Sequence, residues 1–475
     1  MHHSFPFVCF GISQKREAMR SAFLQMRRQD FEADTFAIAK LTVADLKQAE
    51  EEEAHKIPIS NPAVRLLRKH VVATNGHVLG SDHACAAYQG MIWGTCLFLG
   101  GASLWVTINP ADIHDPIAQI FAGHEIDMDK FCTTMGPDAN QRACTIAENP
   151  YAAEKYFRFI INTVLKTLFG IKSKGGCVSA STGILGRLAA YYGVVEAQGR
   201  GTLHLHMLLW LQHAPNCDEM HTLLQSSDFH ERVRTFIKAN IRAHLDGFTE
   251  ETICSTSRDS QLAYSRPPDP RNESTWACDN ATLEQNLVHA QQVHTCTHSA
   301  CLRMKNGKLS CKRQAPWPLS EDDIIEANGN WTPKRTVAYL NSYCPDVLTT
   351  MRCNNNNKLN TNGSETKHIM WYLTSYTTKN QKTTHNTSTL LANSLAYHKD
   401  NPKYDDLRQC NKLLLYQCIN ILNCEMELSG PQVVLYLMGW DDKFQSHNYV
   451  ALYTNPLLTA LKRTFPDVRY GSQSE

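Results

Sequence analysis

The sequence of 475 residues contains no run that approaches the roughly 20 consecutive apolar residues of a membrane-spanning helix. Its first residues, Met1 to Pro6, lack the charged and long apolar regions of a secretory signal peptide. These absences favour an intracellular protein without a membrane anchor. In that setting we expect the 17 cysteines to be mainly reduced thiols or metal ligands rather than disulfides.

A P-loop is also missing. No segment reads GxxxxGK[ST], and the nearest approach, Asn306-Gly307-Lys308-Leu309, does not match. We therefore expect no ATP hydrolysis by a P-loop mechanism. The formal net charge is only +1, so any contact with nucleic acid must come from a local patch rather than from the charge of the whole protein.

Two local patches are basic. The first segment is crowded with basic residues, namely Lys15, Arg16, Arg20, Arg27 and Arg28. A helix expected after the start signal Asn61-Pro62 carries the second patch on one face, made of Arg65, Arg68 and Lys69. Such faces are either solvated helix surfaces or DNA contacts, and the choice between them depends on motifs elsewhere in the chain.

The most informative segment is a histidine pair on a predicted strand. His204 and His206 lie two residues apart within the apolar run 203–211, so on a strand both side chains leave the same face. The run 194–198 also reads as a strand, and residues 199–201 are suited to a tight turn. A hairpin centred on Arg200 places Glu196 opposite His204.

One carboxylate and two imidazoles form an open ligand set suited to a catalytic divalent ion. The predicted set is Glu196, His204 and His206, with Gln198 as a reserve ligand on the same face. Two alternatives remain open. The histidines are a half-exposed pair without a metal, or they serve a zinc hydrolase that acts on a small molecule, although its usual companion motif H-x-H-x-D-H is absent.

A second motif consists of two tyrosines and a lysine. A helix capped by Ser364 would carry Tyr372, Tyr376 and Lys379 as one stripe, at positions i, i+4 and i+7. The tyrosines of such a helix are often packing residues, but here an adjoining stripe with Leu373 supplies apolar surface. Only about one free phenol in a thousand is ionised at neutral pH. Tyrosine therefore attacks a phosphodiester usefully only beside a metal and groups that stabilise the phenolate.

Three blocks together resemble the Rep nuclease region of Helitron transposases, which are members of the HUH endonuclease superfamily. Residues 198–210 match Q-x-R-G-x-x-H-x-H followed by an apolar run, and residues 372–379 match Y-x-x-x-Y-x-x-K. The third block, residues 104–110, is an apolar segment ending in Asn-Pro. The similarity to fungal-type members extends from about Phe5 to about Tyr449.

The resemblance implies metal-dependent cleavage and transfer of single-stranded DNA at transposon ends, through a 5′-phosphotyrosine intermediate and a free 3′-OH. It implies Mg²⁺ or Mn²⁺ at the histidines, Tyr372 and Tyr376 as nucleophiles, Lys379 at the phosphate or phenolate, and Arg200 as a DNA contact. It also implies a nuclear location. Helitron transposases carry a helicase after the nuclease, and we expect a helicase in trans here.

A group of potential metal ligands lies between these motifs. His294, Cys296, Cys301 and Cys311 fall within eighteen positions, and three thiolates with one imidazole are typical of structural rather than catalytic zinc. His298 is an alternative to His294, and chance clustering in a cysteine-rich chain is the other interpretation. Helitron Rep regions have a similar Cys/His insertion before the tyrosine helix. We expect a zinc knuckle that stabilises the fold.

The predicted fold is α/β (α+β), with a central antiparallel sheet of the HUH type flanked by helices. We expect a helical, charged region over 1–98, a nuclease core over 99–249, a polar insertion with the Cys/His cluster over 250–345, and the tyrosine helix with further helices over 346–475. The asparagine run 354–357 reads as a low-complexity loop. The alternative function is a catalytically decayed or domesticated zinc-containing DNA-binding protein.

Overall fold

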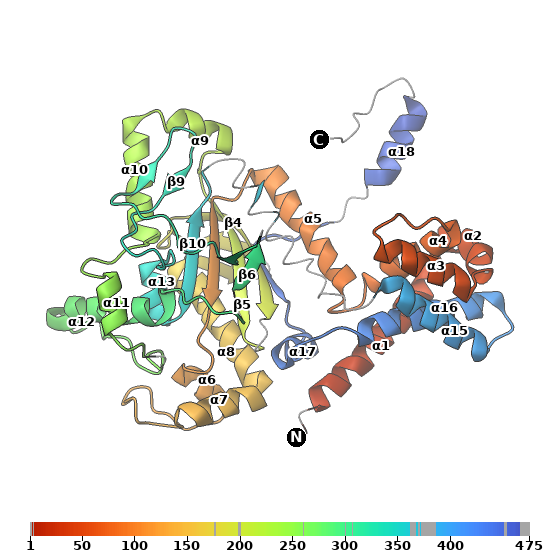
Figure 1. Cartoon of the computed structure of the whole chain (residues 1–475), viewed down its shortest axis with the longest axis horizontal. Coiled ribbons are helices and arrows are strands. Elements are labelled where there is room, and N and C mark those ends of the chain that lie inside the picture. The colour runs from red at the N-terminus through yellow and green to blue at the C-terminus, as the bar shows by residue number, and fades with distance from the viewer. Residues whose placement is uncertain are drawn as a thin grey trace.

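The computed structural model describes residues 2, 4–174, 177–197, 201–259, 261–299, 301–305, 307–361, 367–368, 371, 386–450 and 454–465. Two bodies are visible in Figure 1, a sheet covered by helices on the left and a group of helices on the right. Helix α5 (Asp82–Leu99) lies between them and begins after Ser81, whose side chain accepts a hydrogen bond from the Ala84 N–H.

The central sheet has five strands, all antiparallel, in the order β10-β1-β5-β4-β11. This confirms the mixed α/β class and the antiparallel sheet. The two longest strands form a hairpin at the centre, and β1, formed by most of the apolar block 104–110, lies beside them. The strands are β1 (Leu104–Asn109), β4 (Leu188–Ala197), β5 (Leu203–Leu211), β10 (Asn354–Leu359) and β11 (Lys443–Gln445).

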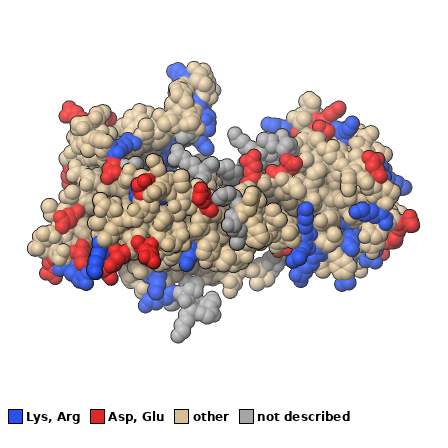
Figure 2. Space-filling model, turned by 90° about the horizontal axis from the view of Figure 1, so that it is seen from below, with Lys and Arg blue, Asp and Glu red and all other residues tan. Residues whose placement is uncertain are grey.

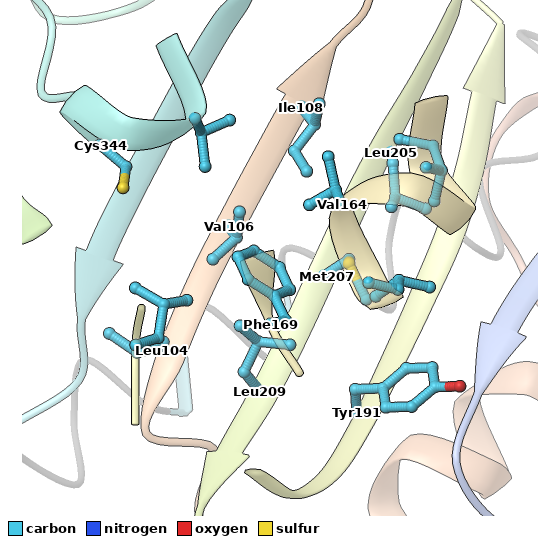
Figure 3. Packing of buried hydrophobic residues seen from close by; sticks show 14 of the residues in the cluster. Leu104, Val106, Ile108, Val164, Phe169, Tyr191, Leu205, Met207, Leu209 and Cys344 are labelled. Carbon is cyan, nitrogen blue, oxygen red and sulfur yellow. The ribbon is translucent and has the colours of Figure 1, made fainter. Parts of the chain in front are cut away.

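One face of the sheet packs on a long helix. Alternate residues of β1 and β5, such as Val106 and Met207, point into a core with Val164 and Phe169, as Figure 3 shows. The helix α8 (Pro150–Thr163) is capped by Asn149 and continues as a π-helical turn, η1 (Val164–Leu168). Gly170 then ends it with φ +69°, a backbone conformation that glycine adopts without strain.

Helix α5 covers the opposite face of the sheet. Ile92 is buried there against Tyr192, Leu208 and Trp210, which alternate with the residues of the first core. Because successive side chains on a strand point to opposite faces, β5 contributes to both cores. This explains why the run 203–211 is almost continuously apolar.

The helical body combines both ends of the sequence. Residues of the first four helices, such as Phe31 and Leu67, share one core with Leu391 and Ile419 near the C-terminal end. The bounds are α1 (Phe5–Gln25), α2 (Gln29–Ala39), α3 (Val43–Ala54), α4 (Pro62–Asn75), α15 (Thr387–Asp400) and α16 (Leu407–Cys424). Helix α17 (Gly430–Leu437) packs on Phe10 of α1.

The asparagine run is strand β10, so the prediction of a loop was wrong. Asn355 and Asn357 point into the protein and are almost fully buried. The Asn355 Oδ1 accepts a hydrogen bond of 2.7 Å from the Cys344 N–H, and the Asn357 Nδ2 donates to the Asn240 carbonyl at 3.5 Å. These two buried side-chain amides form hydrogen bonds with backbone groups at the ends of helices. This explains why polar residues occupy the inward-facing positions of the strand.

The remaining elements surround the sheet. They are α6 (Pro116–Phe121), α7 (Ala139–Glu148), β2 (Ile171–Lys174), β3 (Cys177–Ala180), α9 (Cys217–Leu223), α10 (Ser227–Asn240), α11 (Glu250–Ser255), α12 (Glu273–Leu287), η2 (Val288–Gln292), β6 (Leu302–Lys305), β7 (Lys308–Cys311), β8 (Ile324–Ile325), β9 (Trp331–Thr332), α13 (Pro345–Met351) and α18 (Thr454–Thr464). Over the described ranges, no helix is both long and apolar enough to cross a membrane.

Candidate metal centres

The hairpin of β4 and β5 has the predicted register. Glu196 pairs with His204, and Val194 pairs with His206. Both histidines therefore share a face with Leu208 and Trp210, which is the face that α5 covers. Of the three predicted ligands, the Glu196 carboxylate and the His206 imidazole are in contact at this end of the hairpin, whereas the His204 imidazole contacts neither through a hydrogen bond among the described residues.

His206 is held by contacts on both sides of its ring. Its Nε2 lies 3.0 Å from the Glu196 Oε2, and its Nδ1 lies 3.1 Å from the Thr107 Oγ1 of β1. The ring of Trp105 stacks on it with centroids 6.2 Å apart. Sequence reasoning assigned no role to Thr107 or Trp105, although alternation along β1 places both on the histidine face.

His204 has different surroundings. Its side chain is buried, and within the described part of the chain its Nε2 has no hydrogen-bond partner. Burial, assisted by the neighbouring His206, lowers the pKa of His204 to about 4. The imidazole is thus neutral at physiological pH, the form that binds a metal ion. A buried nitrogen without a partner, next to a histidine–carboxylate pair, fits a metal ligand.

The tyrosine motif lies outside the described residues, as do Gln198 and Arg200. The residue directly before the motif is described. The ring of Trp371 meets Trp93 of α5 edge to face, with centroids 6.5 Å apart. Helix α5 therefore contacts both the sheet face that bears the histidines and the residue that precedes Tyr372.

The four predicted cysteine and histidine ligands converge. Ligand atoms of His294, Cys296, Cys301 and Cys311 all lie within 4.8 Å of one another. The His294 Nε2 is 3.3 Å from the Cys311 sulfur, 3.4 Å from that of Cys296 and 3.5 Å from that of Cys301. His298, the alternative ligand, does not belong to this group. A compact set of one nitrogen and three sulfurs fits a metal such as zinc.

Backbone amides support the sulfur atoms of this cluster. The Thr297 N–H donates to the Cys301 sulfur at 3.4 Å, and the Arg313 N–H donates to the Cys311 sulfur at 3.3 Å. Although burial opposes ionisation of Cys311, the backbone N–H groups of Ala315 and Arg313 hold its thiol pKa below the usual value. Such bonds favour the thiolate, which is the metal-binding form.

The predicted basic patch on α4 is engaged within the protein. Arg68 forms an ion pair of 2.7 Å with Glu53, and Lys69 lies 3.3 Å from Asp30. The Arg65 Nη1 donates to the Ile59 carbonyl. Figure 2 shows acidic and basic side chains interspersed over both bodies in that view, in keeping with the small net charge. Internal pairing reduces the charge that α4 offers to DNA.

A cavity of about 750 Å³ opens beside the turn of the histidine hairpin. Gly201 and Thr202 line it together with Asp112 and Glu148, and its lining includes no lysine or arginine among the described residues. Burial raises the pKa of Asp112 to about 6.

Residues 1–209 match the family model described as the Helitron helicase-like domain at the N-terminus. The match includes β1, β4 and both histidines. This region of the chain is therefore Helitron-related, which confirms the resemblance seen in the sequence and indicates a transposase-related role with DNA as the partner. No curated protein matches the chain.

Proposed function

We propose that this protein is the nuclease of a Helitron-like rolling-circle transposition system, which cleaves and transfers single-stranded DNA. The observation that carries the proposal is His204, a buried and neutral imidazole whose Nε2 has no partner in the described structure, beside the His206–Glu196 pair. A buried polar atom without a partner is costly, so its retention favours a functional explanation.

In this mechanism His204, His206 and Glu196 would hold Mg²⁺ or Mn²⁺. The ion supplies Lewis-acid polarisation of the scissile phosphate when bound. Thr107 orients the His206 ring through its contact with Nδ1, which leaves Nε2 directed toward Glu196, where the ion would take the place of the direct contact between the two side chains.

The covalent step belongs to the tyrosine pair. The phenol oxygen of Tyr372 or Tyr376 forms a bond to phosphorus, while the bond from phosphorus to the 3′ oxygen breaks. The phenol loses its proton and the departing oxygen gains one, giving a 5′-phosphotyrosine and a free 3′-OH. Lys379 orients the phosphate or stabilises the phenolate, and the second tyrosine holds or transfers a second strand. A helicase would act in trans, in the nucleus.

The tyrosine assignment is tested by removing one oxygen at a time. Tyr372→Phe and Tyr376→Phe keep the ring, so a packing role would cost about 1 kcal/mol of stability or less and leave cleavage intact. If the phenols are nucleophiles, one substitution suppresses the covalent adduct and the other impairs strand transfer. The measurement is incubation with a labelled single-stranded oligonucleotide and Mn²⁺, followed by a denaturing gel and mass spectrometry of the trimmed adduct.

Tyr397→Phe is the matched control, because Tyr397 is an exposed tyrosine on α15 of the helical body. It should leave the adduct unchanged, whereas His206→Ala should abolish it. A double Tyr372→Phe, Tyr376→Phe protein that still forms covalent DNA would overturn the proposed mechanism. Hydrolysis without any covalent species would instead favour a metal hydrolase.

A further inference from the structure

The cavity beside the turn of the histidine hairpin lies at one end of the central sheet. Thr202 lines it and comes two residues before His204, which is about 7 Å at the rise of an extended chain. Asp112 lines it from the segment that follows β1. Because β1 and β5 are antiparallel, with Ile108 paired to Leu205, the end of β1 and the beginning of β5 meet at this edge. The backbone of β5 therefore connects the cavity directly to the histidine pair.

The starts of two helices form other walls of this cavity. A Cβ atom added to Gly201 in the hairpin turn would lie 3.7 Å from the Ser429 Cβ, directly before α17. A Cβ atom added to Gly430 would lie 3.0 Å from the Pro150 Cβ, at the start of α8. Figure 1 shows α7 and α8 below the sheet, with α17 at the side of α8. These close approaches fix both helix starts beside the hairpin turn.

Two aromatic side chains of the cavity lining are open to solvent. Phe7 of α1 is 44% exposed and Tyr151 of α8 is 40% exposed, whereas Ile146 and Val434 are buried apolar residues of the same lining. Exposed aromatic rings can stack nucleobases, because every base has a flat π surface. The cavity volume of about 750 Å³ lies within the range of about 300–1,000 Å³ that is usual for sites of small organic groups. The shape and lining thus suit a planar, uncharged ring.

Asp112 gives the cavity a hydrogen-bond acceptor. Its Oδ1 accepts a hydrogen bond of 2.9 Å from the Ile113 N–H, and among the described residues no lysine or arginine pairs with its carboxylate. An ionised carboxylate only accepts hydrogen bonds. Aspartate and glutamate accept such bonds from the exocyclic amino group of cytosine, whereas thymine carries no amino group. The carboxylate therefore favours a base that donates.

We infer that this cavity binds one unpaired base of single-stranded DNA next to the histidine pair, and that Asp112 selects a base with an amino group (cytosine, adenine or guanine) over thymine. The inference rests on the proposed function, because that function supplies the single-stranded DNA. Phe7 and Tyr151 provide the surface on which the base stacks. The histidine pair then acts on a phosphate, whereas the cavity reads one base of the sequence.

The test measures the affinity of the full-length protein for a fluorescent single-stranded oligonucleotide without added divalent metal, at pH 8, where a carboxyl group with a pKa of about 6 is ionised. An abasic site moved along the oligonucleotide should identify one position that weakens binding about a hundredfold, because stacking and a hydrogen bond are both lost. At that position, the amino-bearing base is replaced by its analogue without the amino group: pyrimidin-2-one for cytosine, purine for adenine or hypoxanthine for guanine. This replacement should weaken wild-type binding about tenfold, the loss expected for one hydrogen bond to a charged group.

Asp112→Ala should remove the difference between the two bases, because no acceptor remains, and Asp112→Asn should retain part of it. Asp228→Ala is the matched control, because Asp228 is an exposed aspartate on α10, outside the cavity lining, and it should preserve the full difference. Phe7→Ala, at an exposed position, should reduce the effect of the abasic site and leave the preference for the amino group. The thermal midpoint confirms that each variant is folded.

An abasic scan in which no position stands out would overturn the inference, as would a preference for the amino group that is equal in wild type and Asp112→Ala. Neither outcome depends on cleavage, so a covalent adduct formed by the same protein would still support the nuclease mechanism. Conversely, a protein that forms no adduct but shows the Asp112-dependent preference would contradict that mechanism and support the base-binding cavity.

Discussion

Glu154 on α8 is a carboxylate without solvent exposure. Its Oε1 accepts a hydrogen bond of 2.9 Å from the Arg158 Nε, whereas no described residue bonds to its Oε2. Burial raises the pKa of Glu154 to about 7, although the charge of Arg158 opposes the shift. One ion pair therefore does not compensate for the loss of water around this group.

This shift predicts a pH-dependent stability. The folded-state pKa lies above the unfolded value, so the native protein binds more protons between them and stability falls as pH rises from about 4.5 to about 7. At about 1.4 kcal/mol per pKa unit, the effect amounts to about 3 kcal/mol. In urea unfolding, the stability of wild type relative to Glu154→Gln should fall across this range. A difference that stays constant with pH would contradict the assignment.

At the scale of elements, the short β6–β7 hairpin is flanked by two candidate metal ligands, Cys301 and Cys311. Most side chains of these strands are exposed, so little apolar burial stabilises the hairpin. Where a small unit lacks a core, metal binding supplies the folding energy. The side chains that join the hairpin to His294 and Cys296 are those of the two other members of the cluster, Cys301 and Cys311.

Removing one thiolate should therefore release the metal and unfold the insertion. Cys296→Ser or Cys311→Ser should lose stoichiometric zinc in elemental analysis and lose hydrogen-exchange protection over residues 294–317, with the central sheet unaffected. Cys278→Ser is the control, because Cys278 is exposed on α12 and outside the cluster. Folded wild-type protein that contains no zinc would disprove a zinc site.

At the scale of the molecule, the helical body is made by residues distant in sequence. Ile419 is fully buried in the core shared with α1–α4, and the Ser388 side chain at the start of α15 meets Glu53 of α3 at 2.7 Å. The helical body is therefore a single unit that can form only after both ends of the chain have been made.

A substitution that leaves a cavity in this core should destabilise helices from both ends of the sequence. Ile419→Ala is expected to cost about 2–5 kcal/mol, the usual range for a large-to-small change in a core. Hydrogen exchange should rise in α2 and α4 as well as in α16, since all three line the same core. Lys403→Ala, at an exposed position in the preceding loop, should change neither. A response confined to α16 would contradict a shared core.

Local sequence determined the elements and the pairing of the histidine hairpin. Period-two alternation and a tight turn are sufficient to set the register of neighbouring strands, so Glu196 could be placed opposite His204 without a structure. The helix start at Pro62 followed from the capping residue Asn61 directly before it. The four candidate ligands of the Cys/His cluster could also be grouped from the sequence, because they lie within eighteen positions and a short segment can readily bring them together.

Only the tertiary structure decided which long-range neighbours these elements meet. The asparagine run gives no apolar alternation, and it becomes a strand because β1 and the ends of two helices satisfy its amides. The contact of Thr107 with His206 joins residues separated by 99 positions, and α15 and α16 join α1–α4. The burial and the charge of a site depend on such long-range contacts. No short sequence pattern specifies these contacts, because the same local pattern is compatible with many different arrangements of the chain.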